Sequence, residues 1–233
     1  MAMPRGWSPI AATVLALVVV NVANNRVLPR GAYVPFSVAA AVALLAFAVR
    51  VDGRSWADLG LARADLASGA RWGAAIIAGL ATVYVVGYAV PFTHDLFLDD
   101  RVRTMTTSSV MASAFVRVPF GTVLLEEVAF RGVLLAQVAA RARWWTAVAV
   151  SSALFGLWHV LPSMGVEAVN PVAEDTVGTL PGWITVVGSV VLTALAGVVF
   201  CWLRRRSRSL LAPMALHWAT NSLGYLFAWW AWR

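Results

Sequence analysis

The stretch Glu126-Glu127-Val128-Ala129-Phe130-Arg131 decides the fold, because it places three charged side chains inside a long apolar segment. A charged group at the centre of a bilayer costs about 2.5–3.5 kcal/mol on insertion scales, so such groups face the interior of a helical bundle and mark either chemistry or a structural ion pair. The chain around this stretch is 61% hydrophobic and only 12% charged, whereas soluble domains carry about 25% charged residues. The composition therefore predicts an all-α, polytopic transmembrane helical bundle with a polar site inside it.

About seven apolar segments approach the ~20 residues that cross a bilayer. They lie near 8–28, 34–49, 71–91, 109–138, 144–164, 183–203 and 209–230. The fourth segment is longer than a span requires and carries the glutamate pair near its middle, so we expect it to be tilted, kinked or split there. We interpret the chain as one integral membrane domain, with N-terminal helices and loops in 1–104 and core helices in 105–233.

The charged loops predict the orientation. All of the basic residues are arginines, and they cluster in the loops 50–71, 141–143 and 204–208. These three loops share one side of the membrane if there are seven spans. The opposite loops contain the acidic residues Asp95, Asp99, Asp100, Glu167, Glu174 and Asp175. The positive-inside rule then predicts a cytoplasmic N-terminus and an outer C-terminus, although Arg26 and Arg30 fall on the other side.

Two further sequence features limit the class of protein. The net charge of +7 is explained by arginines in short loops, so it does not indicate a nucleic-acid partner. The first segment has no clear small-residue cleavage site, which favours an uncleaved helix over a signal peptide. We expect a multi-pass protein of a bacterial or archaeal plasma membrane, surrounded by lipid.

The charged stretch predicts different roles for its two carboxylates. On a helix, Glu127 and Arg131 are four residues apart and lie on one face, where they can form a supporting ion pair. Glu126 is rotated by about 100° from Glu127 and points elsewhere. If it faces a cavity, it is a candidate general base. The structural alternative is a single ion-pair network of all three groups that ties helices together.

Two more polar pairs occur at helical spacing, Phe155 with His159 and His217 with Asn221. The second pair presents an imidazole and a carboxamide on one helix face, which suits the stabilisation of an oxyanion. Its structural alternative is a histidine–asparagine hydrogen bond that locks adjacent helices. Trp158 and Trp218, each beside one of these histidines, either wall a pocket or only pack.

One depth calculation argues against a single site. In the predicted topology, His217 lies ~12 Å and His159 ~22 Å beyond the starts of their segments at ~1.5 Å per residue. The two histidines can line one cavity only if the fifth segment is tilted, is shifted or begins outside the membrane core.

The three motifs EExxxR, FxxxH and HxxxN, in this order on successive apolar segments, resemble the CPBP family of CAAX-type intramembrane proteases, Abi proteins and Rce1-like type II CAAX endopeptidases. The similarity covers roughly residues 105–228, and the stretch Trp56-Ala57-Asp58-Leu59-Gly60-Leu61 is similar to a short pre-helix segment of many members.

The resemblance implies an intramembrane endopeptidase that acts on a peptide or membrane protein, including prenylated CAAX substrates. It also implies that Glu126 acts with His159 to activate water and that His217 and Asn221 stabilise the oxyanion. Glu127 and Arg131 would support this site. A metal-independent mechanism is implied, so we expect no cofactor.

Three alternatives remain open at this point. Glu126, His159 and His217 could instead hold zinc, as a two-histidine, one-carboxylate site. The same buried network would also suit a non-enzymatic membrane partner, such as a bacteriocin immunity protein or a scaffold. A transporter would use buried carboxylates too, but the chain has no evident inverted repeat.

Overall fold

The computed structural model describes residues 6–164 and 181–233, and every regular element in these two ranges is a helix. The long α-helices are α1 (Ser8–Val22), α2 (Tyr33–Arg50), α3 (Leu66–Ala89), α9 (Trp144–Trp158), α12 (Gly182–Ser207) and α13 (Leu211–Ala231). The short elements between them are η1 (Ala23–Val27), η2 (Arg30–Ala32), η3 (Arg63–Asp65), α4 (Pro91–His94), η4 (Asp95–Phe97), α5 (Asp100–Arg103) and α10 (Val160–Ser163). The acidic residues 167, 174 and 175, used above to predict orientation, lie outside the described residues.

The fourth predicted segment is one continuous run of helical elements with changing winding. In chain order they are α6 (Thr107–Ala112), the π-helix η5 (Ser113–Val123), α7 (Leu124–Glu126), the π-helix η6 (Glu127–Leu134) and α8 (Leu135–Ala139). Pro119 lies inside η5, where it has no backbone N–H to give to an α-helical ladder. The irregularity predicted near the glutamate pair is therefore a change from α to π winding, which is frequent at functional sites.

Six helices among the described residues are long and apolar enough to cross a membrane. They are Ser8–Val27, Arg30–Arg50, Arg63–Ala89, Thr107–Ala139, Trp144–Ser163 and Gly182–Ser207. The seventh predicted segment is also a helix, α13 with 21 residues, but it is not among the six. Polar groups such as His217, Thr220 and Asn221 lower its hydropathy.

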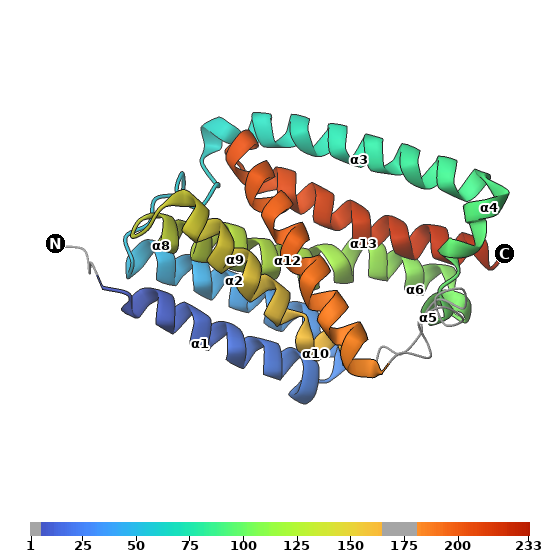
Figure 1. The fold of residues 1–233 in the computed structure, drawn as a ribbon, viewed down its shortest axis with the longest axis horizontal. Helices are drawn as coiled ribbons and strands as arrows, with labels where there is room; N and C mark the ends of the chain where they lie inside the picture. Colours follow the sequence, from blue (N-terminus) through green and yellow to red (C-terminus); the bar gives the residue numbers. More distant parts are fainter. Residues whose placement is uncertain (1–5, 165–180) are drawn as a thin grey trace.

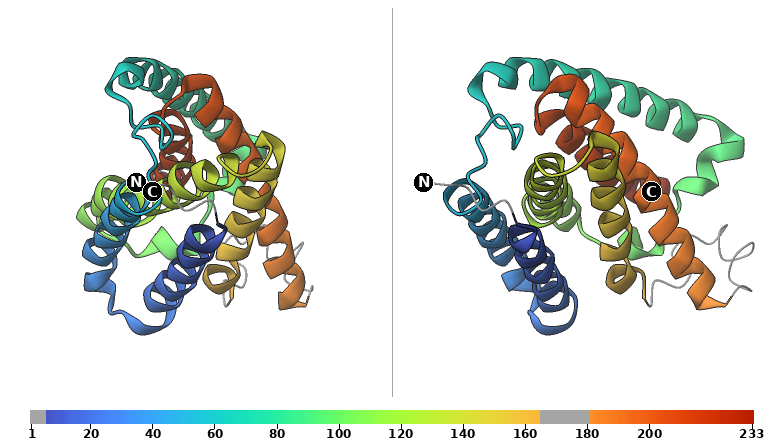
Figure 2. Two further views of the ribbon diagram at one scale, coloured as in Figure 1. Left: turned by 90° about the vertical axis from the view of Figure 1, so that its left-hand side faces the viewer. Right: turned by 60° about the vertical axis from the view of Figure 1, so that its left-hand side comes forward.

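The helix Thr107–Ala139 occupies the centre of the bundle. In Figure 2 (right) it lies between α1 and α2 on one side and α9 and α12 on the other, with α3 and α13 above it. Contacts of η5 with α2 and α13, and of η6 with α9 and α12, agree with this arrangement. The charged stretch therefore lies where several helices can reach it.

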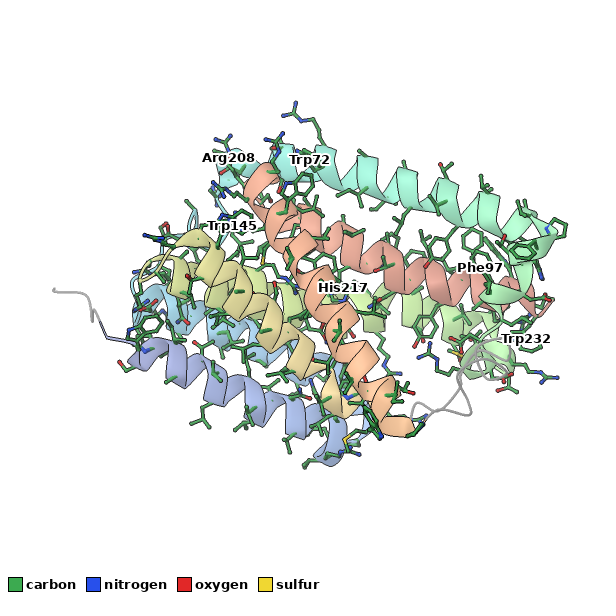
Figure 3. The ribbon with its side chains drawn as sticks, viewed as in Figure 1. Trp72, Phe97, Trp145, Arg208, His217 and Trp232 are labelled. Atoms are coloured by element: carbon green, nitrogen blue, oxygen red, sulfur yellow. The ribbon has the colours of Figure 1, made fainter. Side chains whose placement is uncertain are left out.

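The start of α1 and the C-terminus lie at opposite ends of the long axis of the bundle (Figure 1). The connections α2–α3, α8–α9 and α12–α13, which carry the arginine clusters, lie at the end where α1 begins. In Figure 3, Trp145 and Arg208 mark this end, Phe97 and Trp232 mark the other, and His217 lies between them. This placement agrees with an odd number of traversals.

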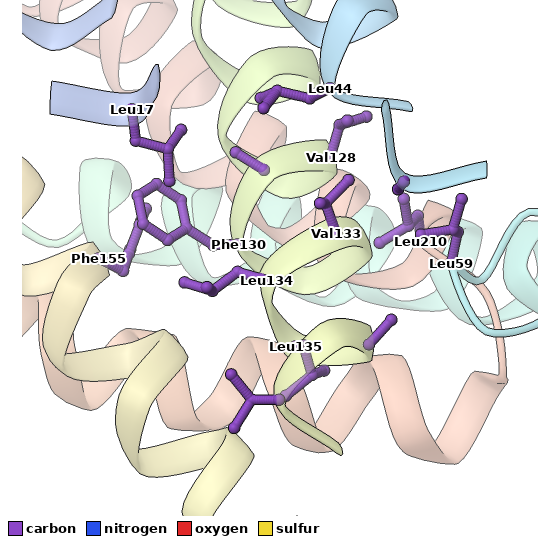
Figure 4. Close-up of a cluster of buried hydrophobic side chains, with 14 of the residues drawn as sticks. Leu17, Leu44, Leu59, Val128, Phe130, Val133, Leu134, Leu135, Phe155 and Leu210 are labelled. Atoms are coloured by element: carbon purple, nitrogen blue, oxygen red, sulfur yellow. The ribbon is translucent and has the colours of Figure 1, made fainter. Parts of the chain in front are cut away.

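A buried hydrophobic cluster fixes η6 against its neighbours (Figure 4). Leu17 of α1, Leu44 of α2 and Phe155 of α9 each bury at least nine-tenths of their surface there. Burial of such side chains within a close-packed interior holds the helix register, because a shifted register would open voids. The cluster therefore sets which faces of the central helix point toward the charged groups.

The loop around Gly60 fixes the start of α13. Gly60 has φ +74°, a left-handed conformation that favours glycine, and a Cβ there would collide with the guanidinium of Arg204. That guanidinium donates hydrogen bonds to the carbonyls of Ala57 and Asp58 at 3.1 and 3.0 Å. The N–H of Leu210 donates to the Gly60 carbonyl at 2.9 Å. This loop thus anchors the turn from which α13 carries His217 into the bundle.

Candidate active site

The charged stretch forms a buried ion pair at the junction of α7 and η6. Arg131 Nη1 lies 3.2 Å from Glu127 Oε1, and both side chains are 0% exposed. The guanidinium carbon of Arg131 is 3.8 Å from the ring centre of Phe155 and 4.6 Å from that of Phe200. These cation–π contacts tie the ion pair to α9 and α12. The predicted pairing of Glu127 with Arg131 is confirmed.

His217 of α13 connects the two glutamates. Its Nδ1 lies 2.8 Å from Glu127 Oε1, and its Nε2 lies 3.8 Å from Glu126 Oε2. Because a carboxylate oxygen only accepts, Nδ1 carries a hydrogen and donates it to Glu127. The ring stacks on Phe200 at 5.3 Å between centres with an interplanar angle of 20°. His217 is therefore held in one orientation, with Nε2 directed toward Glu126.

Glu126 faces a cavity, whereas Glu127 does not. The cavity has a volume of about 1540 Å³, and Glu126 lines it. Glu126 Oε1 accepts a hydrogen bond of 3.0 Å from Trp158 Nε1. Oε2 of the same carboxylate has no hydrogen-bond partner among the described residues. One oxygen is therefore fixed in place, and the other keeps an unused capacity to accept a hydrogen bond.

His159 lines the same cavity from the C-terminal end of α9. Its Nδ1 donates to the carbonyl oxygen of Phe155 at 2.8 Å, because a carbonyl only accepts. In the neutral imidazole, Nε2 is then a hydrogen-bond acceptor. No hydrogen bond joins His159 to Glu126 in the described part of the chain. The two groups share a cavity without direct contact.

Asn221 lies one turn after His217 on α13 and also lines the cavity. The described residues show no hydrogen bond between His217 and Asn221, so the histidine–asparagine lock considered above is absent there. The four residues predicted as catalytic, Glu126, His159, His217 and Asn221, therefore border one space. Glu127 and Arg131 lie behind it.

The difference in depth expected between His159 and His217 is offset by the tilt of α9. Figure 1 shows α9 and α12 running obliquely across the bundle, whereas α13 and the central helix follow its long axis more closely. Fifteen residues of an oblique helix advance less along the long axis than the same number in an aligned helix. His159 and His217 can therefore reach one level although their helix positions differ.

Three residues of the site were not identified as such from the sequence. Trp158 holds Glu126, and Phe200 stacks on His217. Asn21 of α1 donates a buried hydrogen bond of 2.8 Å to the carbonyl of Trp158, which anchors the end of α9. Only Trp158 had a signal, its position next to His159. Trp218 lies outside the cavity lining, and its indole N–H donates to the carbonyl of Ala114.

The described residues contain no group of three or more His, Cys, Asp and Glu side chains placed to hold a metal ion. Glu126, His159 and His217, the zinc ligands considered from the sequence, do not form such a group. Among these residues, His159 makes no hydrogen bond or ion pair with Glu126 or His217. We therefore derive the mechanism from the side chains alone.

The fold and the enclosed carboxylate, imidazole and carboxamide groups define a polytopic membrane protein with a polar site inside its helical bundle. A family model described as type II CAAX prenyl endopeptidase, Rce1-like, matches residues 107–223, about half of the chain. The chain belongs to this family. At the family level it is an intramembrane protease, integral to the membrane, whose substrate is a peptide or protein. Neither a curated protein nor a solved structure matches the chain.

Proposed function

We propose that this protein is a glutamate-dependent intramembrane endopeptidase in which Glu126 is the general base that activates water. One observation carries the proposal. Glu126 lines the cavity and has one carboxylate oxygen without a hydrogen-bond partner, whereas Glu127 lies outside the cavity lining and is held by Arg131 and His217. Of the two carboxylates, only Glu126 borders the space in which a water molecule and a peptide could lie.

The first step places a water molecule between Glu126 and His159. Glu126 Oε2 accepts one hydrogen of the water, and the acceptor Nε2 of His159 orients the other. Trp158 keeps the carboxylate from rotating, because its indole N–H holds Oε1. Transfer of the first proton to Glu126 then gives the water oxygen the electron density to attack the carbonyl carbon of the peptide.

The second step stabilises the negative charge that develops on the carbonyl oxygen. The Asn221 carboxamide donates one hydrogen bond to it. His217 donates a second hydrogen bond from Nε2 when its imidazole carries both protons. The proton held by Glu126 then passes to the amine nitrogen as the C–N bond breaks. The products are a new carboxylate and a new amine.

We infer a substrate that is itself embedded in or attached to the membrane, because the site lies within the bundle between its two ends. C-terminal processing of a prenylated CAAX chain is the substrate class that family membership favours. The arginine-bearing connections lie at the end where α1 begins. We therefore propose a cytoplasmic N-terminus and an outer C-terminus.

The test compares purified wild type with Glu126→Gln in detergent, with a bacterial membrane-protein mixture and a farnesylated CAAX peptide as substrates. Mass spectrometry identifies new termini. The matched control is Asp95→Asn, the same change of acid to amide at a side chain that is 70% exposed. We expect new termini from wild type and the control only. Equal termini from a folded Glu126→Gln variant would refute the proposed base.

A second measurement addresses the metal question directly. The proposed mechanism predicts that metal-free enzyme, verified by elemental analysis, cleaves at the wild-type rate. Stoichiometric zinc in active protein, together with loss of cleavage on chelation and recovery on adding zinc, would replace this mechanism with a zinc-dependent one.

A further inference from the structure

A cationic side chain, Arg117, lines the same cavity as Glu126. It belongs to η5 within the candidate span Thr107–Ala139 and has no ion-pair partner among the described residues. An arginine inside a spanning helix is costly unless an anion or water compensates it, and such residues mark substrate pathways. The cavity therefore contains a positive group that the proposed hydrolysis does not use.

The π winding of η5 brings Arg117 into line with Glu126. In a π-helix, residues five apart follow one another along the same face, and Arg117 and Thr122 are five apart. Thr122 and Glu126 are four apart, the spacing at which α-helical residues share a face. All three residues line the cavity. With α winding throughout, Arg117 would point to another side of the helix.

Tyr33 of α2 contacts both Arg117 and Thr122 and fixes their positions. Its ring centre lies 5.3 Å from the guanidinium carbon of Arg117, and its hydroxyl lies 3.0 Å from Thr122 Oγ1. Gly121 permits the close approach, because a Cβ there would come within 2.5 Å of the tyrosine ring. Arg117 is therefore held by Tyr33 on the same cavity wall as Glu126.

The other two arginines of the cavity lining differ from Arg117. Arg101 is paired with Asp99 at 2.6 Å, and this hydrogen bond raises the pKa of the Arg101 guanidinium. Arg30 lines the cavity from the short helix η2, where no aromatic ring or hydroxyl group of the described residues fixes its position. Arg117 is the described cation that combines a free charge with a fixed orientation.

The spacing suggests what Arg117 binds. It precedes Glu126 by nine positions, which corresponds to at most roughly 13 Å along the helix at ~1.5 Å per residue. An extended peptide advances ~3.3–3.6 Å per residue, so about three or four residues bridge the two groups. Guanidinium groups bind carboxylates with paired, charge-assisted hydrogen bonds. A peptide whose cleaved bond lies at Glu126 would place its C-terminal carboxylate at Arg117 if the chain ends three or four residues after that bond.

We propose that Arg117, supported by Tyr33, binds the C-terminal carboxylate of the substrate and so selects peptides that end a few residues beyond the cleaved bond. This inference rests on the proposed function, because it assumes that Glu126 marks the point of cleavage. It assigns Arg117 a role in specificity, not in the chemical step.

The test uses one farnesylated peptide in two forms, with a free C-terminal carboxylate and with a C-terminal amide. We expect wild type to prefer the carboxylate by roughly 10- to 100-fold in kcat/KM, mainly through KM. Arg117→Gln should lose this preference and cleave the amide form within about twofold of the wild-type rate. The control Arg30→Gln should keep the preference. A peptide with one extra C-terminal residue should be cut one bond further along in wild type.

Several results would overturn the proposal. Equal slowing of both peptide forms by Arg117→Gln would indicate a structural role. Dependence of that slowing on anionic lipid, with no difference between the peptides, would assign Arg117 to a lipid headgroup. Loss of the preference in Arg30→Gln alone would move the site to Arg30. If no preparation cleaves, the proposed function fails. Equilibrium binding of the two fluorescein-labelled peptides to wild type and Arg117→Gln then decides the role of Arg117 independently.

Discussion

The ion pair of Glu127 and Arg131 yields the most quantitative prediction, through the variant Arg131→Met. Methionine keeps an unbranched side chain against Phe155 and Phe200 but removes the guanidinium. Removing one partner of a fully buried pair costs about 3–5 kcal/mol, because the other charge is left uncompensated. His217 still donates to Glu127 at 2.8 Å, which places the expected loss near about 3 kcal/mol.

The double variant Glu127→Gln with Arg131→Met separates the charge from the packing. It leaves no buried charge at this position, and the amide oxygen still accepts from His217. We expect most of the stability to return. A deficit of about 1–2 kcal/mol should remain from the lost cation–π contacts, whose distances are 3.8 and 4.6 Å.

The assay is unfolding by sodium dodecyl sulfate in mixed micelles, followed by the fluorescence of the 12 tryptophans. Arg131→Met should unfold at a clearly lower detergent fraction than wild type, and the double variant should unfold between them. Wild-type stability of Arg131→Met would refute the structural role of the pair. Losses that add in the double variant would refute the coupling between the two charges.

Three further predictions concern single contacts. Trp158→Phe removes the donor to Glu126 and should lower kcat by roughly 10- to 100-fold while the melting temperature stays close to wild type; an unchanged kcat would exclude a positioning role. Asn221→Ala should lower kcat by about 10²–10³-fold with little change in KM, and an effect on KM alone would contradict its role at the oxyanion. Gly60→Ala should lower the melting temperature because of its positive φ, whereas Gly188→Ala, where a Cβ meets nothing within 4 Å, should not; equal melting temperatures would contradict the proposed anchoring of α13.

Helix positions could be predicted from the sequence because apolar segment length and charge placement are local properties. The predicted segments 144–164 and 183–203 correspond to the observed spans Trp144–Ser163 and Gly182–Ser207. The pairing of Glu127 with Arg131 followed from their spacing alone. These features need no knowledge of how the helices pack.

The remaining parts of the site depend on packing and winding. Phe200 reaches His217 only because α12 crosses the bundle obliquely, and no residue spacing encodes that angle. The line from Arg117 to Glu126 requires π winding, for which Pro119 was the one local signal. The spacing of an ordinary α-helix would have placed Arg117 on the face opposite Glu126. The positions of Phe200 and Arg117 in the site therefore could not be predicted from residue spacing.

The two glutamates lie beside one histidine but have different surroundings. Glu127 pairs with Arg131 away from the cavity, whereas Glu126 lines the cavity. A measurement on Glu126 therefore tests the account at its centre.

That measurement is the single-turnover rate of peptide cleavage by wild type and by Glu126→Gln, with enzyme in excess over a peptide that wild type is known to cut. Removal of a general base predicts a rate lower by about 10²–10⁴-fold at unchanged peptide affinity and melting temperature. A rate within threefold of wild type, from a variant that binds the peptide equally well, would contradict the assignment of Glu126 as the base.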